Sequence, residues 1–552
     1  RSGVIFQFES RVDMLRMMAA LQVLPNTCLL AWGWRRRGLA LGAGLLSALA
    51  MPPYGVWLVL ALTLPALVWL LDGAVEQGKE GARQRWVAGF SIGWWFGFGY
   101  FLAGLWWIGS AFLVDGDRFA WMMPFAVLAM PVGLALFPAL ALAIAARFWP
   151  EGPARVLALA LVLSGADYVR GHVLTGFPWN IFGYAFSETL ILAQAASVVG
   201  VYGLGLLVTL ILAAPAVAFD ANARVQKLAI IGLSSVCLVG SLLFGAIRLV
   251  VLEDPQDTAT ELRIVQPAIP QAEKWLPENR DSIFERYISL SEQALEGDDR
   301  DGVERLLIWP ESAVPFLLTV SPEAIVRIAG VVEGRSSFVT GAIRGEEAGG
   351  QTEYFNSVYL FDSDGTVQDV YDKVHLVPFG EYLPLEDLLN TLGLRALVTA
   401  PGAFQAGFRG RPLTLSSGTA FLPLICYEAI FPGLASAEGP RPDFLLNVTN
   451  DAWFGDTAGP YQHVSQSAIR AIEQGLPLVR AANTGVSAVF DAKGREVGIL
   501  PVNIRGILLN RLPGKLSETI YGKYGDKIFL ITQFLILILI LFLRYNRTSR
   551  QN

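Results

Sequence analysis

Long apolar runs fill the first half of this chain, whereas its charged residues gather in the second half. A helix needs about 17 to 25 mostly apolar residues to cross the hydrocarbon of a bilayer. Runs near that length lie at 38–52, 54–72, 86–112, 119–147, 154–171, 189–219, 227–247 and 528–543. With 53% hydrophobic and only 16% charged residues, the chain is too apolar for a soluble protein. We therefore predict eight transmembrane helices and a separate polar domain.

The first two apolar runs are separated by Pro52 and Pro53. Proline interrupts a helix because it lacks an amide donor and its ring clashes with the preceding turn. These two runs therefore predict a hairpin rather than one long helix. For each of the apolar runs, the alternative is a helix buried in a soluble core.

Positive charges flank alternate apolar runs. Three arginines at 35–37 precede the first run, and Arg147 and Arg155 follow the fourth. The intervening loops hold little more than Arg118 and Arg170. Because Lys and Arg are retained in cytoplasmic loops, this bias predicts that both termini are cytoplasmic and that the polar domain lies outside the cytoplasm.

This pattern divides the chain into four predicted parts. Residues 1–27 form an N-terminal segment to which the sequence assigns no role. Residues 28–249 form a transmembrane domain of seven helices, and residues 250–526 form the polar extracytoplasmic domain. Residues 527–552 contain the eighth transmembrane helix and a cytoplasmic tail.

The polar domain alternates strand-like runs with polar helical stretches. The strand-like runs lie at 261–265, 305–308, 338–343, 357–361, 421–426, 444–448 and 478–482, and the clearest helices at 278–295, 322–334 and 460–475. Two turn sequences, DSDG at 362–365 and DAKG at 491–494, predict hairpins. Alternating strands and helices of this kind predict a layered α/β domain.

Cys426 is the one cysteine of the polar domain, because Cys28 and Cys237 fall in or beside apolar runs. It has no local disulfide partner. An unpaired thiol of this kind is either an inert buried cysteine or a nucleophile. Cys426 ends the apolar run AFLPLI and precedes Tyr427 and Glu428, so we expect a turn that exposes the thiol at the edge of a sheet.

Two further groups supply the chemistry that a thiol nucleophile needs. Glu311 follows the strand RLLIWP, and Lys373 lies in the irregular segment DKVHLVPFGEYLP, eight residues before Glu381. A carboxylate can act as the base, and an ammonium can stabilise a thiolate or an oxyanion. The second carboxylate, Glu381, could orient the cation. Taken alone, Glu311 would be a cap or surface carboxylate and Lys373 a solvated charge.

Two histidines of the polar domain, His375 and His463, leave a Cys–His nucleophile open as a rival arrangement. The chain has no Cys/His spacing typical of zinc sites and no basic stripe, and its net charge is −6. We therefore predict no metal, no cofactor and no nucleic-acid partner.

The motifs WPES, DKVHLVPFGE and ICYE resemble the Glu-Lys-Cys triad of the nitrilase superfamily, whose members are carbon–nitrogen hydrolases with an α-β-β-α sandwich. The chain as a whole resembles the bacterial apolipoprotein N-acyltransferases, a membrane-bound family with eight transmembrane helices and a periplasmic nitrilase-like domain. Other matching stretches are GFPW at 176–179, VQPAIPQAEKW at 265–275 and NDAWFG at 450–455. One departure is Pro267 and Ala268, where the family usually has glycine followed by a polar residue.

The resemblance implies a ping-pong acyl transfer in the bacterial inner membrane. A phospholipid would acylate Cys426, and the N-terminal α-amine of diacylglyceryl-cysteine on an apolipoprotein would then take the acyl group. Glu311 would act as the base, and Lys373 would stabilise the oxyanion. We expect a monomer with its catalytic domain in the periplasm.

Four more residues are assigned supporting roles. The resemblance implies substrate handling by Trp275 and support of the triad by Tyr427 and Glu428, in addition to Glu381. Without that resemblance, the aromatic side chains would be core residues and Glu428 a hydrogen-bonded structural group.

Two other functions remain open. The same triad could hydrolyse a small amide in a membrane-tethered amidase, although a single helix would suffice for tethering. The chain could also be a transporter or a lipid-binding scaffold with an inactive enzyme domain. The sequence does not determine the preferred phospholipid, or whether the loop around 380–410 acts as a lid.

Overall fold

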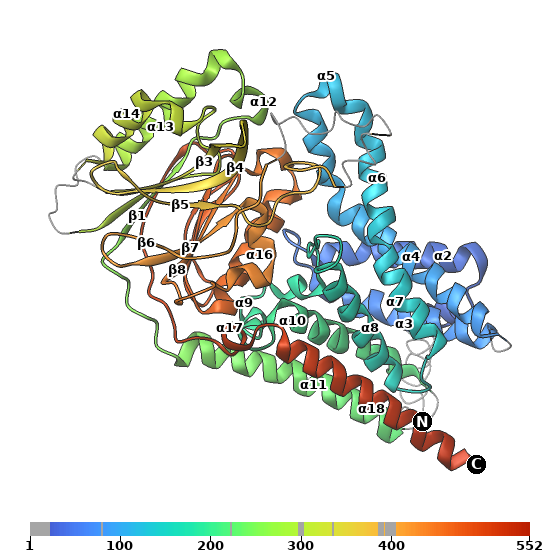
Figure 1. Ribbon diagram of the computed structural model, residues 1–552. Helices are drawn as coiled ribbons and strands as arrows, with labels where there is room; N and C mark the ends of the chain where they lie inside the picture. Colours follow the sequence, from blue (N-terminus) through green and yellow to red (C-terminus); the bar gives the residue numbers. More distant parts are fainter. Residues whose placement is uncertain are drawn as a thin grey trace, which may run out of the picture.

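The computed structural model describes residues 22–78, 81–220, 224–295, 303–333, 336–384, 391 and 404–551. Most of the predicted segment 1–27, and much of the loop around 380–410, therefore lie outside the described residues. Figure 1 shows a bundle of helices on one side of the molecule and a strand-rich part on the other. The two parts meet along α16 (Ala458–Gln474), which lies between the strands and the bundle (Figure 1).

The bundle contains helices from both ends of the chain. They are α2 (Gly33–Ser47), α3 (Leu60–Gln77), α4 (Ala82–Leu105), α5 (Gly116–Phe119), α6 (Met123–Leu134), α7 (Leu136–Arg147), α8 (Ala154–Arg170), α9 (Leu190–Ala193), α10 (Ala196–Ala213), α11 (Arg224–Ala246) and α18 (Lys527–Gln551). A turn at 51–54 separates α2 from α3, which confirms the predicted hairpin at Pro52 and Pro53.

Among the described residues, 6 helical segments are long and apolar enough to cross a membrane. They are Trp57–Gln77, Ala82–Leu113, Gly116–Arg147, Ala196–Ala218, Arg224–Val251 and Lys527–Asn546. The other two predicted spans are helices as well, but α2 has 15 residues and α8 has 17. At 1.5 Å per residue, a helix of 15 residues covers only about 22 Å, so α2 is shorter than a typical span, and α8 is at the lower limit of the range.

Small residues allow α4 to pack closely against its neighbours. A Cβ atom at Gly44 of α2 would lie 2.0 Å from the carbonyl oxygen of Phe96 in α4. A Cβ atom at Gly93 of α4 would lie 2.3 Å from the carbonyl oxygen of Pro138 in α7. Such contacts between backbones are the usual way in which membrane helices gain packing energy, since lipid gives no hydrophobic drive between them.

The strand-rich part is an α/β domain with two six-stranded sheets, ordered β12-β1-β2-β3-β4-β5 and β11-β10-β9-β8-β7-β6. The strands are β1 (Glu261–Gln266), β2 (Arg305–Trp309), β3 (Ser337–Ala348), β4 (Gln351–Phe361), β5 (Val367–Asp372), β6 (Leu413–Thr414), β7 (Ala420–Ile425), β8 (Phe444–Thr449), β9 (Leu478–Ala482), β10 (Ser487–Phe490), β11 (Glu496–Leu500) and β12 (Gly506–Arg511). All the predicted strands are present, and β4–β5 and β10–β11 are the two predicted hairpins.

The sheets form the two middle layers of the α/β domain. Apolar side chains from both sheets, including Ile308 and Ile425, form one buried core between them. Helices α13 (Arg280–Leu295) and α14 (Pro322–Val332) cover the outer face of the first sheet. Helix α16 covers the second sheet, and its Ile469 and Ile472 belong to the buried core of the helical bundle. The α/β domain is therefore joined to the bundle by a continuous apolar interface.

Ala268, one of the two residues at which the sequence departs from the family pattern, has a left-handed backbone with φ of 51°. Its amide donates to the carbonyl of Asn483 at 3.1 Å, which holds the loop in this path. A left-handed conformation costs an alanine roughly 1–2 kcal/mol because its Cβ approaches a carbonyl oxygen. Asparagine tolerates the same region better than alanine does.

We therefore expect Ala268→Asn to raise the stability of the protein by about 1 kcal/mol. Ala268→Val, whose branched side chain is least compatible with positive φ, should lower it. The melting temperature of each variant in detergent, compared with that of the wild type, measures these changes in stability. An Asn variant that melts below the wild type would contradict this account of the loop.

Candidate functional site

Three strand ends carry the predicted triad. Glu311 lies two residues after β2, Lys373 directly follows β5, and Cys426 directly follows β7. The first two strands belong to one sheet and β7 to the other. Since the sheets face each other, their strand ends bring the three side chains together, and the charges of Lys373 and Glu311 both act on the Cys426 thiol.

The Lys373 ammonium is fully buried and lies between two carboxylates. Its Nζ donates to Oε1 of Glu381 at 2.9 Å and lies 3.8 Å from Oε1 of Glu311. Burial acts to lower the pKa of Lys373, but the charges of Glu381 and Glu311 outweigh it and raise the pKa above its usual range. Lys373 is therefore a permanent cation at neutral pH.

Asn356, in the middle of β4, links the two carboxylates. Its Nδ2 donates to Oε1 of Glu311 and to Oε1 of Glu381, both at 2.8 Å. The second oxygen of Glu311 accepts the backbone N–H of Asn450 at 2.8 Å. Both oxygens of Glu311 thus accept hydrogen bonds, as an ionised carboxylate does, and each retains capacity for a further proton donor. The Oδ1 atom of Asn356 is buried and has no partner among the described residues.

Cys426 is held at a sharp turn at the end of β7, with a left-handed φ of 52°. Its carbonyl oxygen accepts from Nε2 of His463 at 3.1 Å and from Nδ2 of Asn447 at 3.4 Å. Cys426 is half-buried and β7 is an inner strand, so the residue lies at a strand end rather than at the predicted edge of the sheet.

The surroundings of the Cys426 thiol favour its protonated form. Burial and the Glu311 carboxylate raise its pKa well above the usual range, whereas Lys373 and a hydrogen bond with Thr449 act in the opposite direction. The resting group is therefore a thiol, which has to give up its proton to a base before it can attack. Glu311, whose carboxylate acts on the thiol electrostatically, is the candidate base.

Glu428 connects the segment of Lys373 to the turn of Cys426. Its Oε1 accepts the backbone N–H groups of Val374 at 2.7 Å and His375 at 3.1 Å, and its Oε2 accepts that of Ile425 at 2.7 Å. The side chain is fully buried. Burial raises the pKa of Glu428 to about 7, although its backbone hydrogen bonds act to lower it. This carboxylate fixes the distance between the cation and the nucleophile.

The remaining predicted residues lie at the rim of this cluster. Tyr427 is buried, and its hydroxyl donates to the carbonyl of Gly176 in the helical bundle at 3.1 Å. Trp275 is 46% exposed and follows Lys274, whose ammonium donates to the carbonyl of Glu311 at 3.4 Å. The Lys274 ammonium also lies 6.0 Å from the centroid of the Trp275 ring, which places the indole near the segment that carries Glu311.

Neither histidine is placed as a partner of the thiol. His463 uses Nε2 for the Cys426 carbonyl and Nδ1 for Oδ1 of Asp451 at 2.9 Å. The ring of His375 packs against Phe431, with centroids 4.1 Å apart. The geometry therefore favours the Glu-Lys-Cys arrangement over a Cys–His pair.

Sequence patterns did not reveal two residues of the site. Asn356 lies within a strand, where an isolated polar residue carries no signal of function. Lys274 is fully buried, and burial lowers its pKa to about 8. The sequence motif that contains it indicates only Trp275 as a functional residue. The common physical signal is a buried polar group with incomplete pairing, which appears only once the chain is folded.

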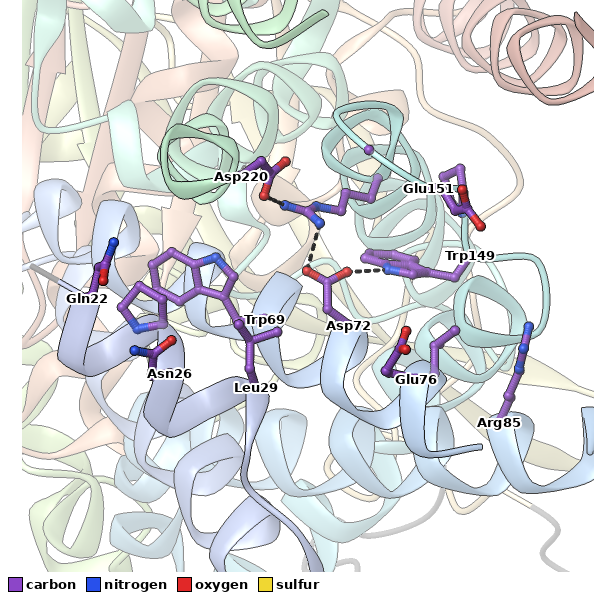
Figure 2. A pocket seen from close by; sticks show the side chains of 15 residues that line it. Gln22, Asn26, Leu29, Trp69, Asp72, Glu76, Arg85, Trp149, Glu151 and Asp220 are labelled. Carbon is purple, nitrogen blue, oxygen red and sulfur yellow. Dashed lines mark hydrogen bonds and ion pairs between the residues drawn. The ribbon is translucent and has the colours of Figure 1, made fainter. Parts of the chain in front are cut away.

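A cavity of about 430 Å³ lies elsewhere, among α3, α4 and α8. Figure 2 shows Asp72, Trp149 and Asp220 around it. Arg155 forms ion pairs with both Asp72 and Asp220. Arg155 is in the first turn of α8, whereas the loop that reaches the Glu-Lys-Cys cluster begins at the other end of that helix. This cavity and the candidate site therefore lie apart, and none of the predicted site residues lines the cavity.

Comparison with known proteins covers both parts of the chain. The family model for the apolipoprotein N-acyltransferase N-terminal domain matches residues 43–214, and the carbon–nitrogen hydrolase model matches residues 262–521. An apolipoprotein N-acyltransferase of Rhodopseudomonas palustris is 45% identical over 527 residues, which is 94% of this chain and 97% of the relative. The chain belongs to the apolipoprotein N-acyltransferase family. Its membership, together with the apolar helices, makes it a membrane-bound protein.

A second apolipoprotein N-acyltransferase, from Brucella suis, is 43% identical and covers 89% of this chain and 92% of its own. Among solved structures, a carbon–nitrogen hydrolase from Helicobacter pylori covers 52% of this chain and 94% of its own, at 16% identity and a TM-score of 0.34. This TM-score is too low for the likeness to bear on the assignment.

We predict that Glu428→Gln lowers the rate of the enzyme by about 10²-fold, the scale of loss that a misplaced reacting group causes. Both carboxylate oxygens of Glu428 accept backbone N–H groups. In either orientation of the glutamine side chain, its NH₂ group would therefore face a backbone N–H, and two donors cannot bond each other. An unpaired buried donor costs about 1–3 kcal/mol, and relaxation would separate Lys373 from Cys426. The measurement is the acyl-transfer rate of folded, full-length protein.

Glu473→Gln is the matched control. Glu473 is also fully buried and accepts a backbone N–H, that of Val201 at 2.8 Å, but none of its recorded partners belongs to the candidate site. The Glu473→Gln variant should have a lower melting temperature than the wild type but the same acyl-transfer rate per folded molecule. Full activity of Glu428→Gln would contradict the role assigned to this carboxylate.

Proposed function

We propose that this protein transfers an acyl chain from a membrane phospholipid to the N-terminal α-amine of diacylglyceryl-cysteine on apolipoproteins, through a thioester on Cys426. The observation that carries the proposal is the 45% identity to an apolipoprotein N-acyltransferase along 94% of the chain. That match includes the helical bundle as well as the α/β domain. The buried Glu311, Lys373 and Cys426 cluster supports the chemistry.

In the first half-reaction, Glu311 takes the proton of the Cys426 thiol as the sulfur attacks the sn-1 ester carbonyl of the phospholipid. The Lys373 ammonium stabilises the oxyanion that forms on the carbonyl oxygen. The tetrahedral intermediate then breaks its bond to the glycerol oxygen, which receives the proton from Glu311. A lysophospholipid leaves, and the acyl group stays on Cys426 as a thioester.

In the second half-reaction, the α-amine of the apolipoprotein attacks the thioester carbonyl and gives a proton to Glu311. The carbon–sulfur bond breaks, the leaving sulfur takes that proton from Glu311 to restore the thiol, and an amide is formed. An amide does not return its acyl group to a thiol readily, so the step is effectively one-way.

The lipid substrates account for the membrane domain. Withdrawing an acyl chain from the bilayer costs about 0.8 kcal/mol for each CH₂ group, so a catalytic domain seated on membrane helices lets both substrates keep their chains in hydrocarbon. Trp275, half-exposed beside the Glu311 segment, is the residue we assign to substrate handling. The enzyme needs no cofactor or metal for these steps, and we propose that it acts as a monomer.

We further propose that α2 and α8 cross the membrane together with the 6 longer segments. This places the catalytic domain, residues 250–526, in the periplasm and both termini in the cytoplasm, with seven spans in residues 28–249. The excess of Lys and Arg in the alternate loops supports this topology. The bacterial inner membrane is the corresponding location.

The experiment is acyl transfer by the full-length protein in vesicles of phosphatidylethanolamine and phosphatidylglycerol. The acceptor is a diacylated lipopeptide with a free N-terminal amine, and mass spectrometry detects the added acyl group. We expect transfer by the wild type and none by Cys426→Ala, because the alanine variant cannot form the thioester. An acceptor with an acetylated amine controls for ester exchange and should stay unmodified.

Two results would contradict the proposal. Transfer by Cys426→Ala at the wild-type rate would remove the thioester mechanism. Hydrolysis of small amides by a wild-type protein that leaves the lipopeptide unmodified would favour the membrane-tethered amidase.

A further inference from the structure

The loop that follows α8, residues 173–179, has an unusual backbone. Leu174, Thr175 and Gly176 have consecutive positive φ angles of 54°, 77° and 83°. Positive φ is uncommon for residues other than glycine. Each such residue costs on the order of 1–3 kcal/mol, so it persists only where contacts with the surrounding structure offset that cost. Something must therefore hold this loop in its path.

Arg170, the last residue of α8, holds the loop from inside. Its Nη1 donates to the carbonyls of Phe177 at 2.5 Å and Trp179 at 2.6 Å, and its Nη2 donates to Oδ1 of Asp167 at 2.8 Å. Asp167 in turn accepts the backbone N–H of Phe182 at 3.2 Å. The arginine is 1% exposed. Its planar guanidinium makes these three hydrogen bonds from two nitrogen atoms in a fixed geometry, which the single ammonium nitrogen of a lysine does not reproduce.

The other side of the loop touches the candidate site at two points. The carbonyl of Gly176 accepts the hydroxyl of Tyr427, the residue next to the nucleophile, at 3.1 Å. Phe431, which packs against the ring of His375 with centroids 4.1 Å apart, lies against the loop at Gly176. A Cβ atom at Gly176 would lie 3.1 Å from the ring of Phe431, so the loop is packed tightly against the site.

We propose that Arg170, a residue of the membrane domain, is a positioning residue for acyl transfer. It holds the loop 173–179 in its left-handed path, and the loop fixes the side chains that adjoin Cys426 and Lys373. The nucleophile turn is thus oriented partly by the membrane helices rather than by the α/β domain alone. This inference rests on the proposed function for its reaction, but its geometry concerns Cys426 whatever the substrate.

A purely structural role for Arg170 would be to join the two domains, and the chain offers a matched control for that role. Arg248 is also a buried arginine of the helical bundle. Its Nη2 donates to the carbonyls of Ile472 and Ala492 in the α/β domain at 3.5 and 3.4 Å, and its Nε to Gln194. Its recorded hydrogen bonds include neither the loop 173–179 nor a predicted site residue.

The test is a double-mutant cycle on the full-length protein with Arg170→Lys, Tyr427→Phe and the two combined, beside Arg248→Lys. The rate of Cys426 acylation by a defined phospholipid is measured in a single turnover, and the melting temperature is measured for every variant. Tyr427→Phe removes only the hydroxyl that bonds Gly176, so it tests the same link without altering the loop's interior.

We expect Arg170→Lys and Tyr427→Phe each to slow acylation by 10-fold or more, up to about 10²-fold. The double variant should be no slower than the slower single one, because both changes break the same link. The acylation rate of Arg248→Lys should stay within about twofold of the wild-type rate, even if its melting temperature falls as much as that of Arg170→Lys. Equal losses in Arg248→Lys and Arg170→Lys, or losses that multiply in the double variant, would overturn the proposal.

The rate of Cys426 alkylation by iodoacetamide separates this inference from the proposed function. A wild-type protein that forms no acyl-enzyme would refute the proposed function. In that case the same double-mutant cycle is evaluated with the rate of Cys426 alkylation instead of the rate of acylation. Changes in alkylation that are shared by Arg170→Lys and Tyr427→Phe but absent from Arg248→Lys would still support the positioning role. Unchanged alkylation in both variants would reject it.

Discussion

A fully buried ammonium, that of Lys373, is the constraint on which the site depends. Removing such an ion from water costs several kcal/mol unless charges and hydrogen bonds compensate. Glu381 at 2.9 Å and Glu311 at 3.8 Å supply the compensation, and Asn356 holds both carboxylates through its Nδ2. The strand ends of two sheets have to converge for these groups to meet. The two-sheet architecture is therefore what makes the charge cluster possible.

The cluster also explains why a thiol of raised pKa is compatible with nucleophilic chemistry. A resting thiolate would add a further negative charge beside the Glu311 carboxylate, where burial also disfavours it. Moving the proton from Cys426 to Glu311 during the attack leaves the total charge unchanged. Charge balance thus favours removal of the proton by the base while the carbon–sulfur bond forms. It disfavours a thiolate that is present before the substrate binds.

The helical bundle takes part in this arrangement through α16 as well as through the loop after α8. Gln462 of α16 accepts the indole N–H groups of Trp179 at 2.7 Å and Trp107 at 3.0 Å, both from the bundle. The next residue, His463, bonds the carbonyl of Cys426. Two routes of hydrogen bonds therefore connect membrane helices to the nucleophile turn, which suits an enzyme whose substrates reside in a bilayer.

The sequence was informative wherever one pattern determined one element. All the predicted strands and both hairpins are present, because alternating β-rich residues and Asp/Gly turns act locally. The triad was recognisable from its motifs, and the folded chain brings its members together. Asn356 and the bridging role of Glu428 were not predictable in detail, since both depend on contacts between segments distant in the chain. The two short helices, α2 and α8, show that apolar length alone does not settle the number of spans.

The central claim is that Cys426 carries the acyl group between two substrates. The direct measurement is mass spectrometry of the Cys426 peptide after incubation of the purified protein with a defined phospholipid alone, compared with Cys426→Ser. The account predicts a fatty-acyl mass on the wild-type peptide that neutral hydroxylamine removes and that a diacylated lipopeptide discharges. A folded, reduced wild-type protein that acylates the lipopeptide without ever carrying that mass would contradict it.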